Sequence, residues 1–334
     1  MAGTSGVPQG IGTPNVDLVL EGGGVKGIGL LGAVLTLSDA GYRFPRIAGT
    51  SAGAIVAALV ASYQKAGRKL SDLVEVMNSL DYERFAQQST LEKLTGPLGR
   101  GIDLLVHEGM HTGDYLVEWL GGVLGEVGVE TFSDLALTPE EARLSSLAPH
   151  QQYTLVVHVS DVSRRALVRL PWDFSEYGKD AGTERVVDAV RASMSIPFYF
   201  QPVEVETETG RVTWVDGGLL SNFPITVFDR TDGVPSRWPT YGVKLSAQPQ
   251  VAKDRPVGTP LGIAVSCLET LTGDWNRYHL RDEGVNQRTI YVDTEGISAT
   301  DFHLDDAKRA RLFENGQSAA RKFLAQLPTT PSPG

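Results

Sequence analysis

The sequence has one cysteine, no excess of basic residues and no long apolar run. Cys267 stands alone among 334 residues, which excludes an internal disulfide framework and any zinc site built from several cysteines. The formal net charge is −10, whereas a general nucleic-acid binder needs clustered Lys and Arg. We therefore expect no nucleic-acid partner, and we expect any contact with a membrane surface to be local and mostly apolar.

The beginning of the chain lacks the features of a secretory signal. The stretch "MAGTSGVPQGIGTPNVDLVL" has no basic n-region and no long apolar segment. No run in the chain approaches the roughly 18 apolar residues of a membrane-spanning helix. The sequence thus predicts a cytoplasmic protein whose contact with any membrane is peripheral.

The chain is long enough for one large folded domain. Residues 1–14 and 328–334 are rich in Gly, Pro, Ser and Thr, and both are predicted to be flexible tails. No linker, repeat or charge block interrupts residues 15–327, which are predicted to form a single domain. Residues 82–150 are the least regular part and are predicted to be a variable, mostly helical insert or lid.

The first ordered unit alternates strands and helices. Residues 16–20 and 46–49 are short apolar strands, and helices are predicted from Ile28 to Gly41 and from Ala52 to Ala66. Two strands joined by a helix imply a parallel pair, and hence an α/β sheet. Further strands are predicted over residues 153–162, 164–170, 211–216, 240–245 and 288–293, with helices over 185–195 and 305–327.

The stretch "IAGTSAGAIVAALVASY" places Ser51 between Gly49 and Gly53. A nucleophile elbow needs such a strand-to-helix turn, with small residues two positions before and after the serine. The helix that begins at Ala52 would direct its N-terminal N–H groups toward negative charge near Ser51. The same residues also suit a serine that caps a helix, and this segment leaves both interpretations open.

A glycine loop, "GGGVKG" from Gly22 to Gly27, follows the first strand. It fits G-x-G-x-x-G, but a dinucleotide site expects an acidic residue at the end of the second strand, which here ends on Gly49-Thr50-Ser51. Alternatively, Gly23 and Gly24 could turn their N–H groups toward an oxyanion because they lack Cβ. A tight structural turn is the third interpretation.

A serine nucleophile needs a base, and histidine is the usual one. None of the six histidines lies in a Gly-flanked turn at a strand end, and His107 and His111 lack the glutamate and third ligand of a zinc motif. Asp216 ends a strand in "WVDGG", before Gly217 and Gly218. It would serve as a base if burial raised its pKa, and it is equally suited to an Asx turn.

Taken in order, the three motifs resemble those of the patatin-like phospholipase family. Its members carry G-G-G-x-K/R-G, then G-x-S-x-G, then D-G-G/A far downstream, as "GGGVKG", "GTSAG" and "DGG" stand here. The blocks "GMHTGDYLVEWL", "ASMSIPFYFQPV" and "LSNFPI" are also similar, and the resemblance covers about residues 16–325. It implies a three-layer α/β/α sandwich with a mostly parallel central sheet. It also implies hydrolysis of carboxylic esters in phospholipids or lysophospholipids at a lipid or membrane surface, with no metal or other cofactor.

Carried over to this sequence, the resemblance implies a dyad without histidine, with Ser51 as the nucleophile and Asp216 as the general base. The implied oxyanion hole consists of backbone N–H groups from Gly22, Gly23, Gly24, Val25 and Ala52. The supporting motif positions are Lys26, Gly27, Gly49, Gly53, Gly217 and Gly218. Lys26 would place a cation near the lipid phosphate or the oxyanion, or would be a lysine at a helix start with a solvated amine.

Two other functions remain open at this point. The first is a partner- or ligand-activated protein on the same fold with low activity on its own, which the long variable segment and the tails allow. The second is a dinucleotide-binding protein built on "GGGVKG", which the missing acidic residue disfavours.

Overall fold

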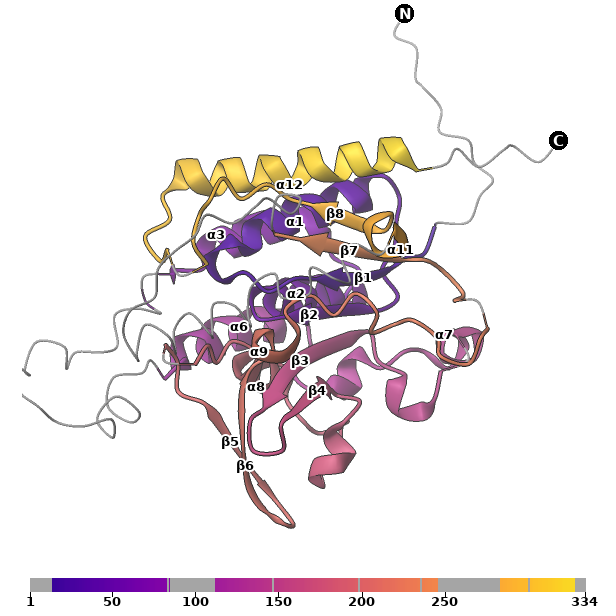
Figure 1. Cartoon of the computed structure of the whole chain (residues 1–334), viewed down its shortest axis with the longest axis vertical. Coiled ribbons are helices and arrows are strands. Elements are labelled where there is room, and N and C mark those ends of the chain that lie inside the picture. Colours follow the sequence, from indigo (N-terminus) through magenta and orange to yellow (C-terminus); the bar gives the residue numbers. More distant parts are fainter. Residues whose placement is uncertain are drawn as a thin grey trace, which may run out of the picture.

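The computed structural model describes residues 14–82, 84, 112–145, 147–197, 199–234, 236–245, 283–299 and 301–327. These residues form one eight-stranded sheet with helices packed against it (Figure 1). The predicted tails, apart from Pro14, and residues 85–111 of the predicted insert lie outside the described residues.

The predicted alternation of strands and helices at the start of the domain is confirmed. The elements are β1 (Asp17–Leu20), η1 (Gly24–Lys26), α1 (Gly27–Asp39), β2 (Ile47–Thr50) and α2 (Ala52–Lys65). Both strands are fully buried, and apart from Asp17 at the start of β1 they consist of apolar and small residues. They pair in parallel, with Leu20 opposite Gly49, so the glycine loop and the Ser51 turn leave the same edge of the sheet.

The other elements follow in chain order. They are η2 (Leu70–Asp72), α3 (Leu73–Ser79), α6 (Asp114–Glu126), η3 (Phe132–Leu135), α7 (Pro139–Ser145), η4 (Pro149–Gln151), β3 (Leu155–Asp161), β4 (Ala166–Leu170), η5 (Phe174–Tyr177), α8 (Val186–Ser193), β5 (Val203–Thr207), β6 (Gly210–Asp216), α9 (Gly218–Ser221), β7 (Thr240–Lys244), α11 (Glu283–Asn286), β8 (Thr289–Tyr291) and α12 (Asp306–Gln326).

The strand order is β5-β6-β3-β2-β1-β7-β8, with β4 paired to β3. Strands β3, β2, β1, β7 and β8 are parallel to their neighbours in this series. Strands β4 and β6 run antiparallel to β3, and β5 runs antiparallel to β6. The predicted α/β fold with a mostly parallel sheet and flanking helices is therefore confirmed, and β5 is a strand that the sequence analysis did not predict.

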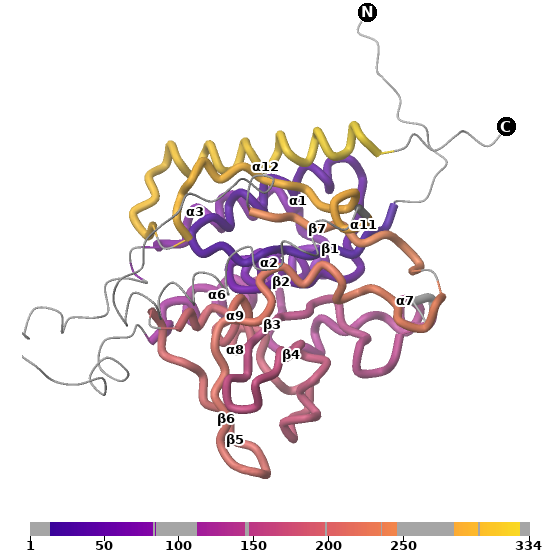
Figure 2. The backbone as a smooth tube through the Cα atoms, in the orientation of Figure 1, coloured from indigo at the N-terminus to yellow at the C-terminus, as the bar shows by residue number. Residues whose placement is uncertain are grey.

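The two faces of the sheet carry unequal layers. Leu18 and Leu20 face a large core shared with α1, α2, α8 and α12. Val19 faces the other way, into a smaller cluster with Trp172 and Phe223. Figure 1 shows α12 lying along α1, and the backbone trace in Figure 2 shows the β5–β6 hairpin projecting at the opposite end of the molecule.

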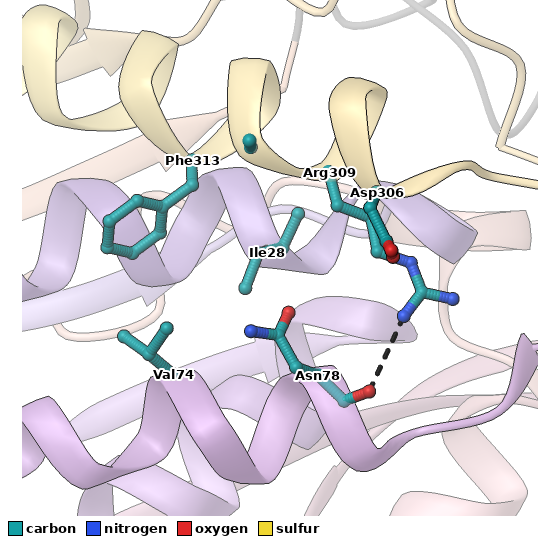
Figure 3. Close-up of a pocket in the computed structure, with 7 residues that line it drawn as sticks. Ile28, Val74, Asn78, Asp306, Arg309 and Phe313 are labelled. Carbon is teal, nitrogen blue, oxygen red and sulfur yellow. Dashed lines mark hydrogen bonds between the residues drawn. The ribbon is translucent and has the colours of Figure 1, made fainter.

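Close backbone contact holds α12 on α1. A Cβ at Gly316 would lie 2.0 Å from the carbonyl oxygen of Gly29, so glycine permits this approach. Near the beginning of both helices, α1, α3 and α12 surround a pocket of about 440 Å³ (Figure 3). Ile28, Val74 and Phe313 form its apolar wall, and none of the predicted site residues lines it.

None of the helices in the described ranges is long and apolar enough to cross a membrane.

Candidate active site

Ser51 occupies the turn between β2 and α2 in an unusual backbone conformation. Its φ is 53° and its ψ −125°, which is a strained region for a residue with a side chain. The Ser51 side chain makes no capping hydrogen bond to α2. The structure therefore holds Ser51 as the apex of a sharp strand-to-helix turn, and its hydroxyl does not serve as a helix cap.

The glycines on either side of Ser51 allow this turn to close. A Cβ at Gly49 would lie 2.2 Å from the carbonyl oxygen of Gly53, and a Cβ at Gly53 would lie 2.4 Å from that of Leu20. A Cβ at Gly22 would lie 3.1 Å from the Cβ of Ser51. The first turn of α2 thus packs directly on the end of β1, with the glycine loop beside Ser51.

Strand β3 brings Ser51 and Asp216 together. Thr50 at the end of β2 pairs with His158, and Asp216 at the end of β6 pairs with Val159. Strand β4 pairs with residues 157–161 along one edge of β3. Strands β2 and β6 therefore both pair along the opposite edge of β3. The two strands run toward each other and end at consecutive positions of β3, which places Ser51 next to Asp216.

Asp216 is only 3% exposed. Burial raises the pKa of Asp216 to about 7, while the Gly218 N–H and the Ser51 hydroxyl, as hydrogen-bond donors, lower it. The Gly218 N–H donates to Oδ1 of Asp216 at 2.7 Å, which is an Asx-type turn. Asp216 therefore fits both the Asx-turn and the general-base interpretation. Its Oδ1 accepts the hydrogen bond of the turn, and its carboxyl, with a raised pKa, lies beside Ser51.

The end of α8 contacts both residues, and the sequence analysis did not identify it as part of the site. Ser193 Oγ accepts the Ser51 N–H at 2.8 Å, and Met194 Sδ lies 3.5 Å from Ser51 Oγ. The carbonyl oxygen of Ser195 accepts the Asp216 N–H at 2.9 Å. The available signal was "ASMSIP", which belongs to one of the blocks shared with the family resembled.

The glycine loop offers fewer free donors than predicted. The Gly22 N–H donates to the Asn222 carbonyl at 3.0 Å, and the Val25 N–H donates to the Ala299 carbonyl at 3.1 Å. The prediction that these two N–H groups are available to an oxyanion is therefore wrong, since both already have acceptors. Within the described ranges, no acceptor is found for the N–H groups of the other three predicted donors, Gly23, Gly24 and Ala52.

A buried ion pair lies at the start of the glycine loop. Lys244 at the end of β7 pairs with Glu21 at the end of β1, and both side chains are 5% exposed. Burial lowers the pKa of Lys26, and Lys244 lowers it further, while Glu21 opposes both effects. This partial burial does not fit the solvated-lysine interpretation, and the Lys26 side chain lies beside Gly23.

Asn222 is a second residue that the sequence analysis did not single out. Its Nδ2 donates to the Gly22 carbonyl at 3.1 Å. The neighbouring Ser221 carbonyl accepts the Thr50 hydroxyl at 3.2 Å. The segment after Asp216 therefore ties the glycine loop to the Ser51 turn, and its signal was the "LSNFP" block.

His158 lies close to these residues, but burial shifts its pKa downward whereas burial shifts that of Asp216 upward. Its side chain is fully buried in β3, and burial lowers its pKa to about 4. It is therefore neutral near neutral pH and is a poor proton acceptor there.

Comparison with known proteins agrees with this geometry. A family model described as Patatin-like phospholipase matches residues 18–229, more than half of the chain, and includes all three motifs. The uncharacterized protein YqhO of Bacillus subtilis (strain 168) is 32% identical over 311 residues, which cover 93% of this chain and 98% of that protein. The crystal structure of VipD from Legionella pneumophila is similar in fold, with a TM-score of 0.51 and 18% identity over 94% of this chain and 67% of that one.

Proposed function

The chain belongs to the patatin-like phospholipase family, and on that premise we propose that it is a serine lipid acyl hydrolase that cleaves carboxylic esters of phospholipids or lysophospholipids. The observation that carries this proposal is the meeting of a strained Ser51 with a buried Asp216 whose pKa is raised to about 7. A base with a pKa near the working pH is well matched to proton transfer.

In the proposed first step, Asp216 takes the proton of the Ser51 hydroxyl while Oγ attacks the ester carbonyl carbon. The carbonyl oxygen becomes an oxyanion, and the N–H groups of Gly23, Gly24 and Ala52 are proposed to bind it. The N-terminal end of α2 adds a favourable dipole. Collapse of this intermediate releases the alcohol, which takes the proton from Asp216 and leaves an acyl group on Ser51.

In the proposed second step, Asp216 takes a proton from water, which attacks the acyl-serine carbonyl. Collapse of the second intermediate releases the fatty acid and returns the proton to Ser51. The same backbone donors serve both steps, because the negative charge develops on the same oxygen. All atoms and protons balance without a cofactor in this scheme.

The substrate part of the proposal rests on the family and on the charges near the loop. The partly buried Lys26 side chain beside Gly23 would, with its amine protonated, favour an anionic group such as a lipid phosphate. We propose a cytoplasmic enzyme that meets its substrate by peripheral contact with a lipid surface. Residues 15–327 are proposed to act as one catalytic domain.

The proposal is tested with a mixed lipid extract analysed by mass spectrometry. Wild-type protein is expected to release fatty acids and lysolipids, and Ser51→Ala and Asp216→Asn are each expected to reduce that release by about 10³-fold or more. Ser62→Ala is the matched control, because Ser62 is a fully buried serine of α2 whose hydroxyl has no hydrogen-bond partner among the residues that the structure describes. Near-normal release by folded Ser51→Ala protein would overturn the proposal.

A further inference from the structure

We propose that Ser193 is a positioning residue that holds the Ser51 turn in its reactive conformation and sets its distance from Asp216. This inference rests on the proposed function of Ser51 and Asp216.

The Ser193 hydroxyl has a fixed direction. It is 0% exposed, and it donates to the His158 carbonyl at 2.6 Å. A serine hydroxyl has one proton to donate, so toward Ser51 it acts only as an acceptor. Ser193 Oγ accordingly accepts the Ser51 N–H at 2.8 Å.

The Ser51 N–H needs such an acceptor. Ser51 has a positive φ, which costs of order 1–3 kcal/mol and persists only where surrounding contacts impose it. A buried N–H without an acceptor would add a further cost. The Ser193 hydroxyl removes the second cost and restrains the peptide bond that precedes the Ser51 Cα.

The other end of the Ser193 bridge reaches the Asp216 turn. The His158 carbonyl that accepts the Ser193 hydroxyl would lie 2.2 Å from a Cβ at Gly217, so the backbone after Asp216 packs on the same oxygen. Two residues beyond the end of α8, the Ser195 carbonyl accepts the Asp216 N–H. Ser193 thus fixes Ser51 to the same part of β3 that positions Asp216.

The end of α8 is itself anchored. Arg191 is 9% exposed, and its guanidinium donates to the Thr112 and Gln201 carbonyls, each at 2.9 Å. It also donates to the hydroxyl of Ser195. Because these bonds immobilise the helix end, the Ser193 hydroxyl is a rigid reference point for Ser51.

The test compares Ser193→Ala with wild type and with Ser62→Ala on a soluble ester. Removing the bridge leaves substrate-binding surfaces in place but loosens the turn, and misplacement of reacting groups costs up to about 100-fold in rate. We expect kcat to fall about 10- to 100-fold with KM within twofold, whereas Ser62→Ala changes both by less than twofold. The midpoint of the pH profile is expected to shift slightly upward, because the Ser51 hydroxyl that lowers the pKa of Asp216 is held less firmly, while burial, the larger effect, is unchanged.

Folding is checked by circular dichroism and thermal unfolding. If Ser193→Ala is not folded at the assay temperature, Ser193→Cys replaces it, since a thiol of similar shape is a weak acceptor, and the same loss of kcat is expected. A kcat within twofold of wild type in a folded Ser193 variant, with Ser51→Ala inactive, would overturn this inference alone. Retained activity in Ser51→Ala would instead overturn the proposed function.

Discussion

Asp216 is subject to opposing electrostatic effects. Burial disfavours its ionised form and raises its pKa to about 7, while two hydrogen-bond donors, the Gly218 N–H and the Ser51 hydroxyl, favour that form. Near neutral pH the carboxyl is therefore divided between its two states. As the proposed general base, Asp216 must be ionised to accept the Ser51 proton.

The activity is accordingly expected to rise with pH. For a soluble ester, kcat/KM should fall about tenfold per pH unit well below 7 and level off above it, since only the ionised fraction of Asp216 is active. The measurement is a profile from pH 5 to 9, with Ser51→Ala subtracted as the background of spontaneous hydrolysis. A profile that is flat or that falls through this range would contradict the assignment of Asp216 as base.

The same pKa shift predicts a change in stability. The folded pKa of Asp216 lies above its ordinary value of 3.8, so folding favours the protonated form. That contribution to the free energy of unfolding is fully present below about pH 4 and is lost as pH rises through about 7. Asp216→Asn should therefore raise the unfolding temperature over wild type more at pH 9 than at pH 5. An equal difference at both pH values would count against the raised pKa.

Among the helices, strands and turns, the sequence predicted those that local residue patterns encode. The alternation from Val16 to Ala66 was recovered because apolar strands and helices with glycine stops are local signals. The same holds for the turn at Ser51, where Gly49 and Gly53 mark the close approach of backbones. Strand β5 was missed because its half-exposed "VEVET" alternates acidic and apolar residues beside a hairpin turn and carries little hydrophobic signal.

Contacts between distant elements could not be predicted in this way. Ser193 and Ser51 are 142 residues apart in the chain, and nothing in the local pattern of α8 indicates which backbone its hydroxyl contacts. For the same reason, the sequence could not show that Ala299 takes the Val25 N–H. The candidate site residues were predicted from sequence motifs, whereas the residues that hold them in place are seen only in the tertiary contacts of the structure.

Two glycine substitutions test whether the contact with Ala299 constrains the glycine loop. Gly24 has φ +57° and a Cβ there would lie 1.8 Å from the Ala299 carbonyl oxygen, whereas Gly67 has φ +66° and nothing within 4 Å. Gly67→Ala should cost only about 1 kcal/mol of stability, through backbone strain. Gly24→Ala carries the same strain and must also displace the Ala299 segment, so it should lower both the unfolding temperature and kcat further. Equal effects of the two substitutions would show that the contact with Ala299 does not constrain the loop.

For the whole molecule, the relevant property is its charge. The chain carries a formal net charge of −10, and like charges repel over a distance of about 10 Å at 0.1 M salt. Approach to an anionic lipid surface is therefore opposed by electrostatics, and the proposed peripheral contact depends on local apolar groups.

Hydrolysis of vesicles should reflect this charge. At low salt, phosphatidylcholine in pure vesicles is expected to be cleaved several-fold faster than in vesicles that also contain phosphatidylglycerol, because the protein accumulates less at the anionic surface. The difference should shrink in 0.5 M salt, since screening shortens the range of repulsion to a few ångströms. Faster cleavage on the anionic vesicles at low salt would indicate a local basic contact surface that outweighs the net charge.

The assignment of Ser51 as the nucleophile is tested by mapping the residue that reacts with a fluorophosphonate, with intact-protein mass spectrometry followed by peptide mapping. The Ser51 oxygen is expected to displace fluoride and form one adduct per chain, on the peptide that contains Ser51. Labelling should be absent in Ser51→Ala and about 100-fold slower in Asp216→Asn, because the base no longer takes the serine proton. A wild-type protein that hydrolyses lipid esters while Ser51 stays unlabelled, or that is labelled at another residue, would contradict the account.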